Sequence, residues 1–211
     1  ADIGDVSRRE VMEALSVKYE EPLYGTILAF NVKILPDAER EASNQNIPIF
    51  WNDIIYNLMD EYVSWMEKER EANIRKEFES LTLPGKIRVM DGFIFRRAKP
   101  AIFGVEVIRG IIESGVSMIN EDGERIGHIS QIQERGESIN RAQEDKEVAI
   151  SMPQPIVGRH VKESDILYVD IPEQDASKLR NKFIGRLTEG EEEALQELVE
   201  IKRKIDILWA V

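Results

Sequence analysis

The residues best suited to chemistry in this sequence are cationic and aromatic side chains clustered between residues 84 and 100. Five cations share this stretch with one acidic residue, Asp91, and they are Lys86, Arg88, Arg96, Arg97 and Lys99. Phe93 and Phe95 are interleaved with them. Cationic grooves with stacking aromatic side chains hold the ends of single-stranded RNA. The stretch is therefore a candidate RNA-binding segment, although an ordinary solvated face can carry the same charges.

The motifs of nucleotide hydrolysis and metal catalysis do not occur in the sequence. There is no GxxxxGK[ST] phosphate loop and no HExxH zinc motif. With no cysteine and only two histidines, His128 and His160, we expect no zinc site held by protein ligands. We interpret each histidine as a packing or hydrogen-bonding residue, and the many carboxylates as solvated helix faces. The sequence predicts no enzyme, no metal site and no cofactor of its own.

Composition limits the class of protein further. The chain has 211 residues, of which 42% are apolar, and this suits a globular protein with a substantial core. The lack of cysteine gives no sign of an oxidising compartment, and no apolar run approaches the roughly 18 residues of a membrane span. The net charge of −12 disfavours a protein that binds nucleic acid over its whole surface. We expect a cytoplasmic monomer with no membrane partner.

The first 51 residues show the alternating pattern of an α/β domain. Helices are predicted over residues 7–18 and 37–46, and strands covered on both faces over 25–34 and 47–51. Ser7 and Glu10 have the spacing of a capping box at the start of the first helix. These elements are too few for a complete parallel sheet. We expect residues 1–51 to be a partial α/β domain whose N-terminal part is truncated.

One long helix is predicted over residues 52–81, because no glycine or proline interrupts the pattern from Asn52 to Ser80. Its first half has one apolar face, formed by Ile54, Ile55, Leu58, Met59, Tyr62, Trp65 and Met66. Its second half is mostly charged. A coiled coil is disfavoured because no heptad persists past Met66. We expect a linker helix whose second half is solvated.

A β-barrel is predicted over residues 82–170, where short alternating strands are separated by turn glycines. Residues 103–118 (FGVEVIRGIIESGVSM) predict a hairpin bracketed by Gly110 and Gly115. Two helices follow, over residues 171–185 and 188–208, and they predict a helix pair (residues 171–211) packed on the barrel. Thr188 and Glu191 form a second capping-box pattern.

Several of these stretches together resemble a known family. AIFGVEVIRGIIESGVSM and ERIGHISQIQERGESINRAQEDKEVAISM resemble the barrel module of translational GTPases. ADIGDVSRREVMEA, ILAFNV, IPIFWNDIIYNL and VGRHVKESDIL, with the long helix, narrow the likeness to the third and fourth domains of the archaeal and eukaryotic translation initiation factor 5B family, to which bacterial initiation factor 2 is related. The helix pair after the barrel supports the archaeal and eukaryotic side. One departure is Asp145, where the family has a turn glycine, and aspartate tolerates that backbone.

The resemblance implies a role in ribosomal subunit joining, with the barrel holding the methionylated acceptor end of initiator tRNA. The residues implied for this contact are Phe95, Arg96, Arg97, Lys99, Gly104, Val105, Arg135, Glu147 and Val148. For the last five, ordinary barrel packing is an equal alternative. GTP binding with magnesium, and GTP hydrolysis, would belong to the parent protein and not to this chain.

The resemblance also implies that the helix pair binds the tail of initiation factor 1A. Apolar stripes recur on both helices, and Trp209 lies outside the stripe of the second, so we expect an exposed groove. The residues assigned to it are Leu179, Lys182, Phe183, Leu198, Ile201, Lys202, Ile205, Leu208 and Trp209. Two other hypotheses stay open: a protein-interaction scaffold with no RNA contact, and the substrate-binding half of an enzyme.

Overall fold

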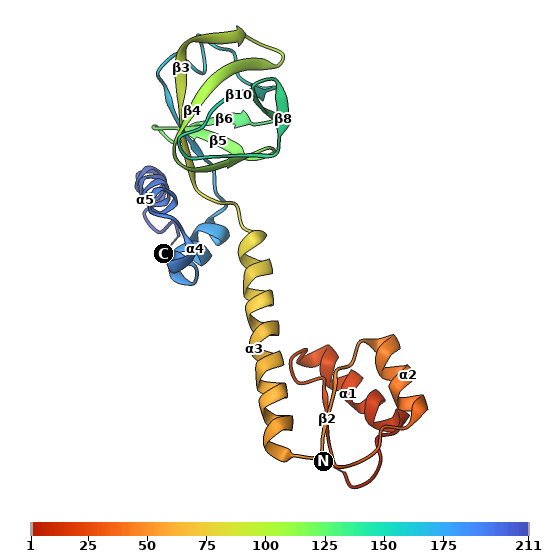
Figure 1. Cartoon of the computed structure of the whole chain (residues 1–211). Helices are drawn as coiled ribbons and strands as arrows, with labels where there is room; N and C mark the ends of the chain where they lie inside the picture. Colours follow the sequence, from red (N-terminus) through yellow and green to blue (C-terminus); the bar gives the residue numbers. More distant parts are fainter. Residues whose placement is uncertain (1, 211) are drawn as a thin grey trace. The chain divides into compact units, whose positions relative to one another are not determined.

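The chain separates into two compact units, Ala1–Ser80 and Leu81–Val211. The computed structural model describes residues 2–210. Ala1, the first residue of the predicted α/β segment, and Val211, the last residue of the predicted helix pair, lie outside the described residues. Figure 1 shows the helices and strands of both units. Among the helices of residues 2–210, none combines the length and the hydropathy that a membrane span requires.

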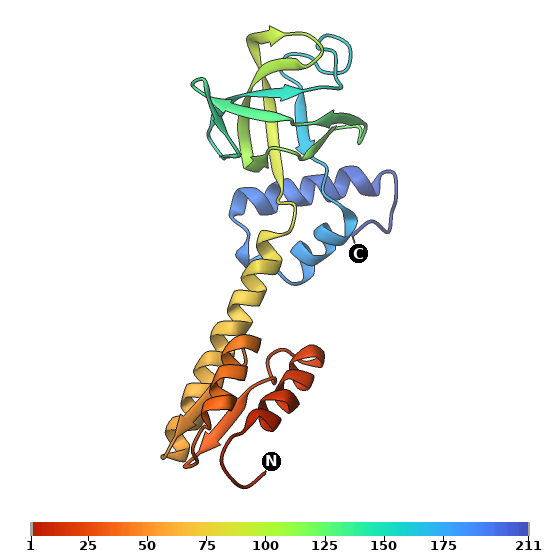
Figure 2. The same ribbon diagram turned by 90° about the vertical axis from the view of Figure 1, so that its right-hand side faces the viewer.

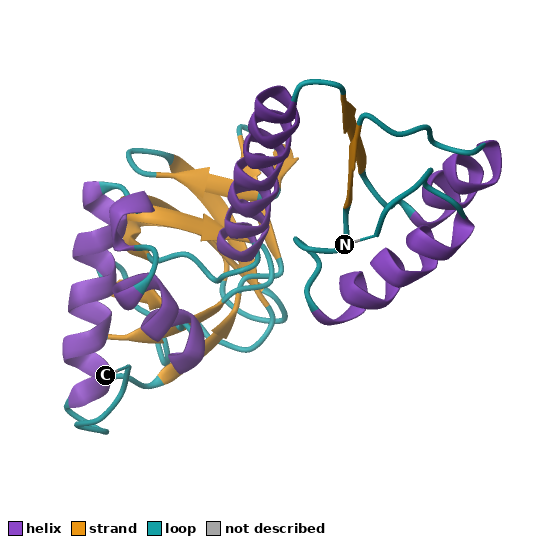
Figure 3. Ribbon diagram, turned by 90° about the horizontal axis from the view of Figure 1, so that it is seen from below, coloured by secondary structure: helices purple, strands orange, loops and turns teal. Residues whose placement is uncertain are grey.

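The first unit is a small α/β arrangement. It contains α1 (Arg8–Glu20), β1 (Ile27–Phe30), α2 (Pro36–Gln45), β2 (Ile49–Asn52) and α3 (Ile55–Glu79). β1 and β2 pair in parallel, and Figure 3 shows them between α3 on one side and α1 with α2 on the other. The predicted capping box is confirmed, because the Ser7 hydroxyl accepts from the Arg9 N–H and the Glu10 carboxylate accepts from the Ser7 N–H.

The prediction that these strands are covered on both faces is wrong for both: no residue of β2 is buried and Trp51 is 51% exposed. β1 is covered on one face only. Ala29 is 2% exposed and belongs to the core under α1 and α2, whereas Leu28 and Phe30 are 42% and 46% exposed. Leu28 and Phe30 stay exposed because it is Phe50 of β2 whose ring packs against α3. Its ring centroid lies 5.8 Å from that of Tyr62 and 5.5 Å from that of Trp65. The helix therefore covers β2 more fully than β1.

α3 is continuous over the predicted linker, and none of its residues 67–78 is buried, as expected from their charges. Its apolar first half packs less than predicted. Leu58 is buried, but Ile54, Ile55 and Met59 are 51%, 43% and 45% exposed. The helix begins at Ile55 because Asn52 completes β2, and the Asn52 side chain accepts from the Ile54 N–H.

The second unit is built on a curled antiparallel sheet. Its strands are β3 (Gly85–Arg96), β4 (Ala101–Glu113), β5 (Ser117–Asn120), β6 (Arg125–His128), β7 (Gln131–Glu134), β8 (Glu137–Ile139), β9 (Arg141–Gln143), β10 (Glu147–Met152) and β11 (Ile166–Val169). The pairing order is β6-β5-β11-β3-β4-β10-β7-β8, with β9 on β4. The predicted closed barrel is thus an open half-barrel, since β6 and β8, four and three residues long, end the path instead of pairing with each other.

The predicted hairpin at residues 103–118 is also wrong. β4 continues through Gly110, and β5 pairs with β6 and β11 instead of with β4. Gly110 has φ +66°, and a Cβ atom there would lie 2.2 Å from the Pro84 carbonyl oxygen. The glycine therefore lets β4 pass close to the start of β3 and does not end the strand. The tolerance predicted for Asp145 is confirmed by its φ of 65°.

The helix pair consists of α4 (Glu173–Asn181) and α5 (Glu189–Arg203), with a short 3₁₀ turn at Ile184–Arg186 between them. Figure 2 shows α5 running beneath the sheet, with α4 on the far side of α5. The Thr188–Glu191 capping box is confirmed. The second helix is shorter than predicted, because α5 ends at Arg203 and i→i−3 turns follow, in which the Ile205 N–H bonds to the Lys202 carbonyl at 3.0 Å and the Trp209 N–H to the Asp206 carbonyl at 3.1 Å.

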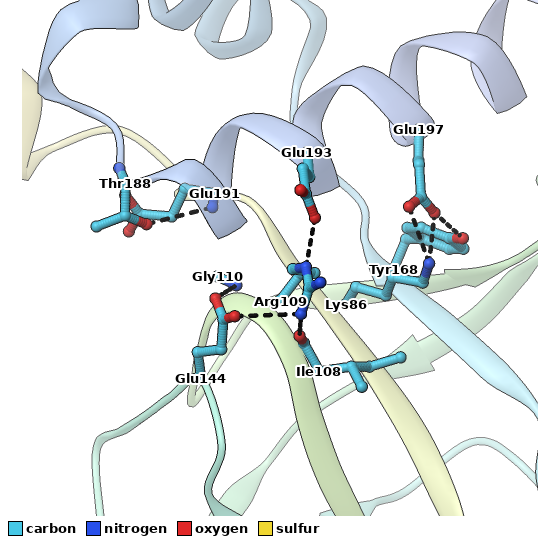
Figure 4. Close-up of polar contacts among 10 residues, drawn as sticks. All are labelled: Lys86, Ile108, Arg109, Gly110, Glu144, Tyr168, Thr188, Glu191, Glu193 and Glu197. Atoms are coloured by element: carbon cyan, nitrogen blue, oxygen red, sulfur yellow. Dashed lines mark hydrogen bonds and ion pairs between the residues drawn. The ribbon is translucent and has the colours of Figure 1, made fainter.

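Charged side chains attach α5 to the sheet (Figure 4). The Glu197 carboxylate accepts from Lys86 Nζ at 2.6 Å and from the Tyr168 hydroxyl at 2.5 Å. Arg109 donates to Glu193 of α5 and to Glu144 before β10. Burial alone would raise the pKa of Glu197, but the hydrogen bonds from Lys86 and Tyr168 lower it overall. Burial and the same carboxylate raise the pKa of Tyr168.

We predict that Glu197→Gln lowers the free energy of unfolding by about 1 kcal/mol at pH 7, because Lys86 loses its ionic partner and solvent screens part of the interaction. The folded-state pKa of Glu197 lies below its ordinary value of 4.5, so the carboxylate stabilises the fold above that pH and less as pH falls through the folded value. Denaturant unfolding from pH 7 to pH 3 measures this: the difference from wild type should shrink in acid. Glu200→Gln, an exposed change on the same helix, is the control and should have no effect.

Candidate functional site

A cleft of about 460 Å³ opens on one face of the curled sheet. β3 and β4 form one wall, and β10 with the β7–β8 turn forms the other. The lining residues are Met90, Phe93, Phe95, Ile102, Gly104, Gln133, Arg135, Gly136, Glu147, Val148 and Ala149. Most of the lining is apolar or aromatic, with one guanidinium and one carboxylate among it. Such a composition suits a ligand with an apolar part and a few polar groups.

A bulge in β3 places the aromatic wall of the cleft. Val89 pairs with Val105 and Ile94 pairs with Phe103, so five steps along β3 oppose two along β4. Gly92, with φ +79°, lies in the extra length. Glu163 accepts from the Gly92 N–H at 2.9 Å, which ties the bulge to the loop before β11. The bulge re-aims side chains that a regular strand would place elsewhere.

Gly104 makes room for one of these aromatic rings. A Cβ atom at Gly104 would lie 2.8 Å from Phe93 Cβ, closer than real contacts allow. Phe93 therefore lies directly over the backbone of β4. Its ring meets the Phe95 ring edge to face, with centroids 6.5 Å apart and planes at 72°. The two rings are 47% and 64% exposed, so they offer open faces for stacking beside the cleft.

The opposite wall carries the charged groups. Arg135 has φ 52° and precedes Gly136 in the β7–β8 turn. Next to it, Lys146 pairs with Glu134 at 2.7 Å, and the hydrogen bond and charge of Lys146 lower the pKa of Glu134. The charge of the Glu134 carboxylate is thereby balanced by Lys146. Arg135 and Glu147 remain as the charged groups of the cleft lining.

The structure brings together five of the residues assigned to initiator tRNA: Phe95, Gly104, Arg135, Glu147 and Val148. The side chains of Val105 and of Val148, its partner across the β4–β10 ladder, are buried and face the core, because neighbouring residues of a strand point to opposite faces. Arg96, Arg97 and Lys99 are exposed and follow Phe95 at the end of β3, outside the lining. The sequence assignment missed Ile102, although it shares a face with Gly104 at a spacing of two. It also missed Met90 and Gln133.

The residues assigned to the tail of initiation factor 1A do not form one groove. Leu179, Phe183, Leu198, Ile201 and Trp209 are buried, because the two apolar stripes pack on each other and on the sheet. Trp209 is 8% exposed, against the expectation that it lies open. Lys202 pairs with Asp170 at 2.5 Å, and Lys182 lies over the Phe183 ring. Ile205 and Leu208 are exposed in the turn after α5.

A different groove, of about 450 Å³, lies between α4 and α5. It is lined by Arg180, Asn181, Ile184, Glu192, Leu195, Gln196, Val199, Glu200 and Arg203. Apolar side chains are flanked there by two guanidinium groups and two carboxylates. Across residues 2–210, no group of three or more His, Cys, Asp or Glu side chains could hold a metal ion.

Comparisons with known proteins relate both units of the chain to translation factors. Residues 83–168 match the family model described as elongation factor Tu domain 4, and residues 1–63 match the one described as translation-initiation factor 2. Proteins of Hyperthermus butylicus and Staphylothermus marinus, each named probable translation initiation factor IF-2, are 48% and 47% identical over 100% of this chain. The chain spans about a third of their length, 35% in both cases.

A solved structure is similar to this chain over its whole length. The crystal structure of GDP-bound aIF5B from Aeropyrum pernix superposes with a TM-score of 0.63 at 41% identity, covering 100% of this chain and 35% of that chain. The structural likeness thus extends over the same length of chain as the sequence likeness to the two proteins above.

We predict that Gly104→Ala displaces Phe93 and lowers the free energy of unfolding by about 1–3 kcal/mol, because the added Cβ cannot fit beside the ring. Chemical shifts of the Phe93 ring and denaturant unfolding measure the two effects. Gly185→Ala is the matched control: a Cβ there meets nothing within 4 Å, so stability should stay within about 0.5 kcal/mol of wild type. Unmoved Phe93 resonances in Gly104→Ala would contradict the packing described here.

Proposed function

The chain belongs to the translation initiation factor IF-2/aIF5B family, and on that premise we propose that its curled sheet binds the methionylated acceptor end of initiator tRNA during ribosomal subunit joining. The observation that carries the proposal is the exposed Phe93–Phe95 pair beside the cleft, with cations on both sides of it. Exposed aromatic faces next to cations are the features that bind single-stranded RNA ends.

Each part of the site has a role in this proposal. Unpaired bases at the acceptor end stack on Phe93 and Phe95. Arg96, Arg97 and Lys99 contact phosphates at the end of β3. The cleft receives the methionyl group, whose side chain packs on Met90, Ile102 and Ala149. Glu147 then lies on the wall where a carboxylate can accept a hydrogen bond from the free amino group of the ester.

The acidic net charge of the chain is more compatible with one local RNA-binding site than with a general affinity for RNA. With a net charge of −12, most of the surface repels phosphate, so binding depends on a local cationic segment and on stacking. The second candidate is a protein-interaction scaffold with no RNA contact, which the same net charge favours. A titration with initiator tRNA separates the two.

We predict that Arg96→Ala with Arg97→Ala weakens binding of methionylated initiator tRNA and lowers the slope of log affinity against log salt by about 0.7 for each lost phosphate contact. Titrations at several salt concentrations measure both quantities. The control is Lys68→Ala with Arg70→Ala, which removes the same charge from the exposed part of α3 and should leave the slope unchanged. Equal slopes for wild type and the Arg96/Arg97 variant would favour the scaffold.

For the helix pair, we propose that the tail of initiation factor 1A binds in the groove between α4 and α5. Ile184, which is 40% exposed, supplies the apolar contact over the buried Leu195 and Val199, and Arg180 and Arg203 supply cations for an acidic tail. The chain itself performs no catalysis in this proposal. GTP hydrolysis with magnesium takes place in other parts of the full-length protein, which also contact the ribosomal subunits in the cytoplasm.

We predict that Ile184→Ser weakens binding of a synthetic initiation factor 1A tail peptide by about five-fold or more, because it removes an apolar contact from the groove. Fluorescence anisotropy measures the affinity. Ile156→Ser is the matched control, since Ile156 and Ile184 are both 40% exposed but Ile156 lies outside the groove lining. If both variants weaken binding equally, or if chemical shifts move in the sheet instead of the helices, the groove is not the site.

A further inference from the structure

The chain beyond α5 turns back toward α4 (Figure 2) and is attached there by its far end. Residues 204–210 are here called the strap. Ile207 and Leu208 in its middle are 80% and 70% exposed, so they add little to the attachment. Trp209 and Ala210, in contrast, are 8% and 0% exposed. The seating of the strap therefore depends on the contacts of Trp209 and Ala210.

Side chains of α4 and α5 hold the backbone of these two residues. Arg203 donates from Nε to the Trp209 carbonyl at 3.1 Å and from Nη2 to the Ala210 carbonyl at 3.4 Å. Arg180 Nη1 donates to the Ala210 carbonyl as well. The Ala210 N–H in turn donates to Glu173 Oε1 at 3.2 Å. Two guanidinium groups and one carboxylate thus fasten the end of the strap.

The same two arginines line the groove between α4 and α5. None of residues 204–210 belongs to that lining, so the strap reaches the groove only through the two guanidinium groups. Nε and Nη2 of Arg203 form an edge on which a guanidinium can bind a carboxylate through two parallel N–H bonds, and such charge-assisted bonds are stronger than bonds to a neutral carbonyl. The strap and an acidic ligand therefore compete for the same donors.

The backbone of Ala210 favours release of the strap once these donors are lost. Its φ is 52°, in the left-handed region that a residue with a Cβ atom seldom adopts. Such a conformation persists where the surrounding contacts hold it. A ligand that takes the arginines removes the contacts at both carbonyls, so the end of the strap loses the partners that keep it in this conformation.

We propose that the strap is an autoinhibitory contact for the α4–α5 groove, which an acidic peptide releases when its carboxylates take Arg180 and Arg203 from the Trp209 and Ala210 carbonyls. The proposal rests on the function proposed above for the groove and adds its regulation. The apparent affinity of the groove is lowered in proportion to the fraction of molecules in which the strap is released. Loosening the strap should therefore strengthen binding.

The test measures binding of the synthetic initiation factor 1A tail peptide to the whole 211-residue chain by fluorescence anisotropy. Glu173→Ala removes the acceptor of the Ala210 N–H and lies outside the groove lining, so it should tighten binding by about three-fold or more. Trp209→Ala should act in the same direction. Glu189→Ala removes the same charge from the first turn of α5 instead of α4, and this matched control should bind as wild type does.

Hydrogen exchange provides a second readout. The Trp209 N–H donates to the Asp206 carbonyl and the Ala210 N–H to Glu173. If the peptide releases the strap, both amides should exchange about ten-fold faster or more in the complex than in the free chain. A ligand that only covers the groove would leave their exchange unchanged or slow it. A peptide with asparagine and glutamine in place of its acidic residues should not accelerate it.

The outcomes separate the strap from the groove. Thermal unfolding shows which variants fold, and Glu173→Ala, at an exposed position, decides the matter if Trp209→Ala does not fold. If wild type binds the peptide but Glu173→Ala binds it equally or more weakly, or if the peptide slows exchange at Ala210, the strap proposal is overturned and the groove proposal stands. If neither wild type nor any variant binds, both proposals are overturned.

Discussion

The β3–β4 ladder is the constraint on which the second unit depends. At one end, Gly85 pairs with Gly110, and the backbones come too close for a side chain at either position. Lys86 and Arg109 follow on the two strands, and both donate to carboxylates of α5. At the other end, the β3 bulge and Gly104 place Phe93 beside the cleft. One pair of strands thus holds the helix pair at one end and shapes the candidate RNA site at the other.

Local signals predicted the elements well. Both capping boxes formed, because their hydrogen bonds lie within four residues of each other. Long-range pairing could not be obtained in the same way. The alternation of residues 103–118 does not show that β5 pairs with β6 and β11, since a strand's partner depends on the whole sheet. Nor does apolar periodicity show where α5 ends, because Ile205 and Leu208 continue the stripe in sequence but lie in a turn.

The candidate site was partly accessible from sequence. Of the residues that the family likeness assigned to the site, Gly104, Arg135 and Glu147 do line one cleft. Val105 was assigned as well, but strand alternation turns its side chain into the core. Met90 and Gln133 could not be found, because they reach the cleft through the β3 bulge and the pairing of β7 with β10. For the helix pair, the apolar residues singled out were mostly those that hold the helices together. Apolar character alone does not distinguish a buried contact from a binding surface.

The burial of Trp209 gives the chain an optical reporter of its own. Its indole is 8% exposed and lies 5.9 Å beneath Lys202 Nζ, whereas Trp51 is 51% exposed and Trp65 is half-buried in the other unit. Indole emission moves to longer wavelength when water reaches the ring, so the blue part of the spectrum reports whether the C-terminal turn is seated. Because the sequence contains no cysteine, one introduced thiol could carry an acceptor dye at a chosen place without competing labels.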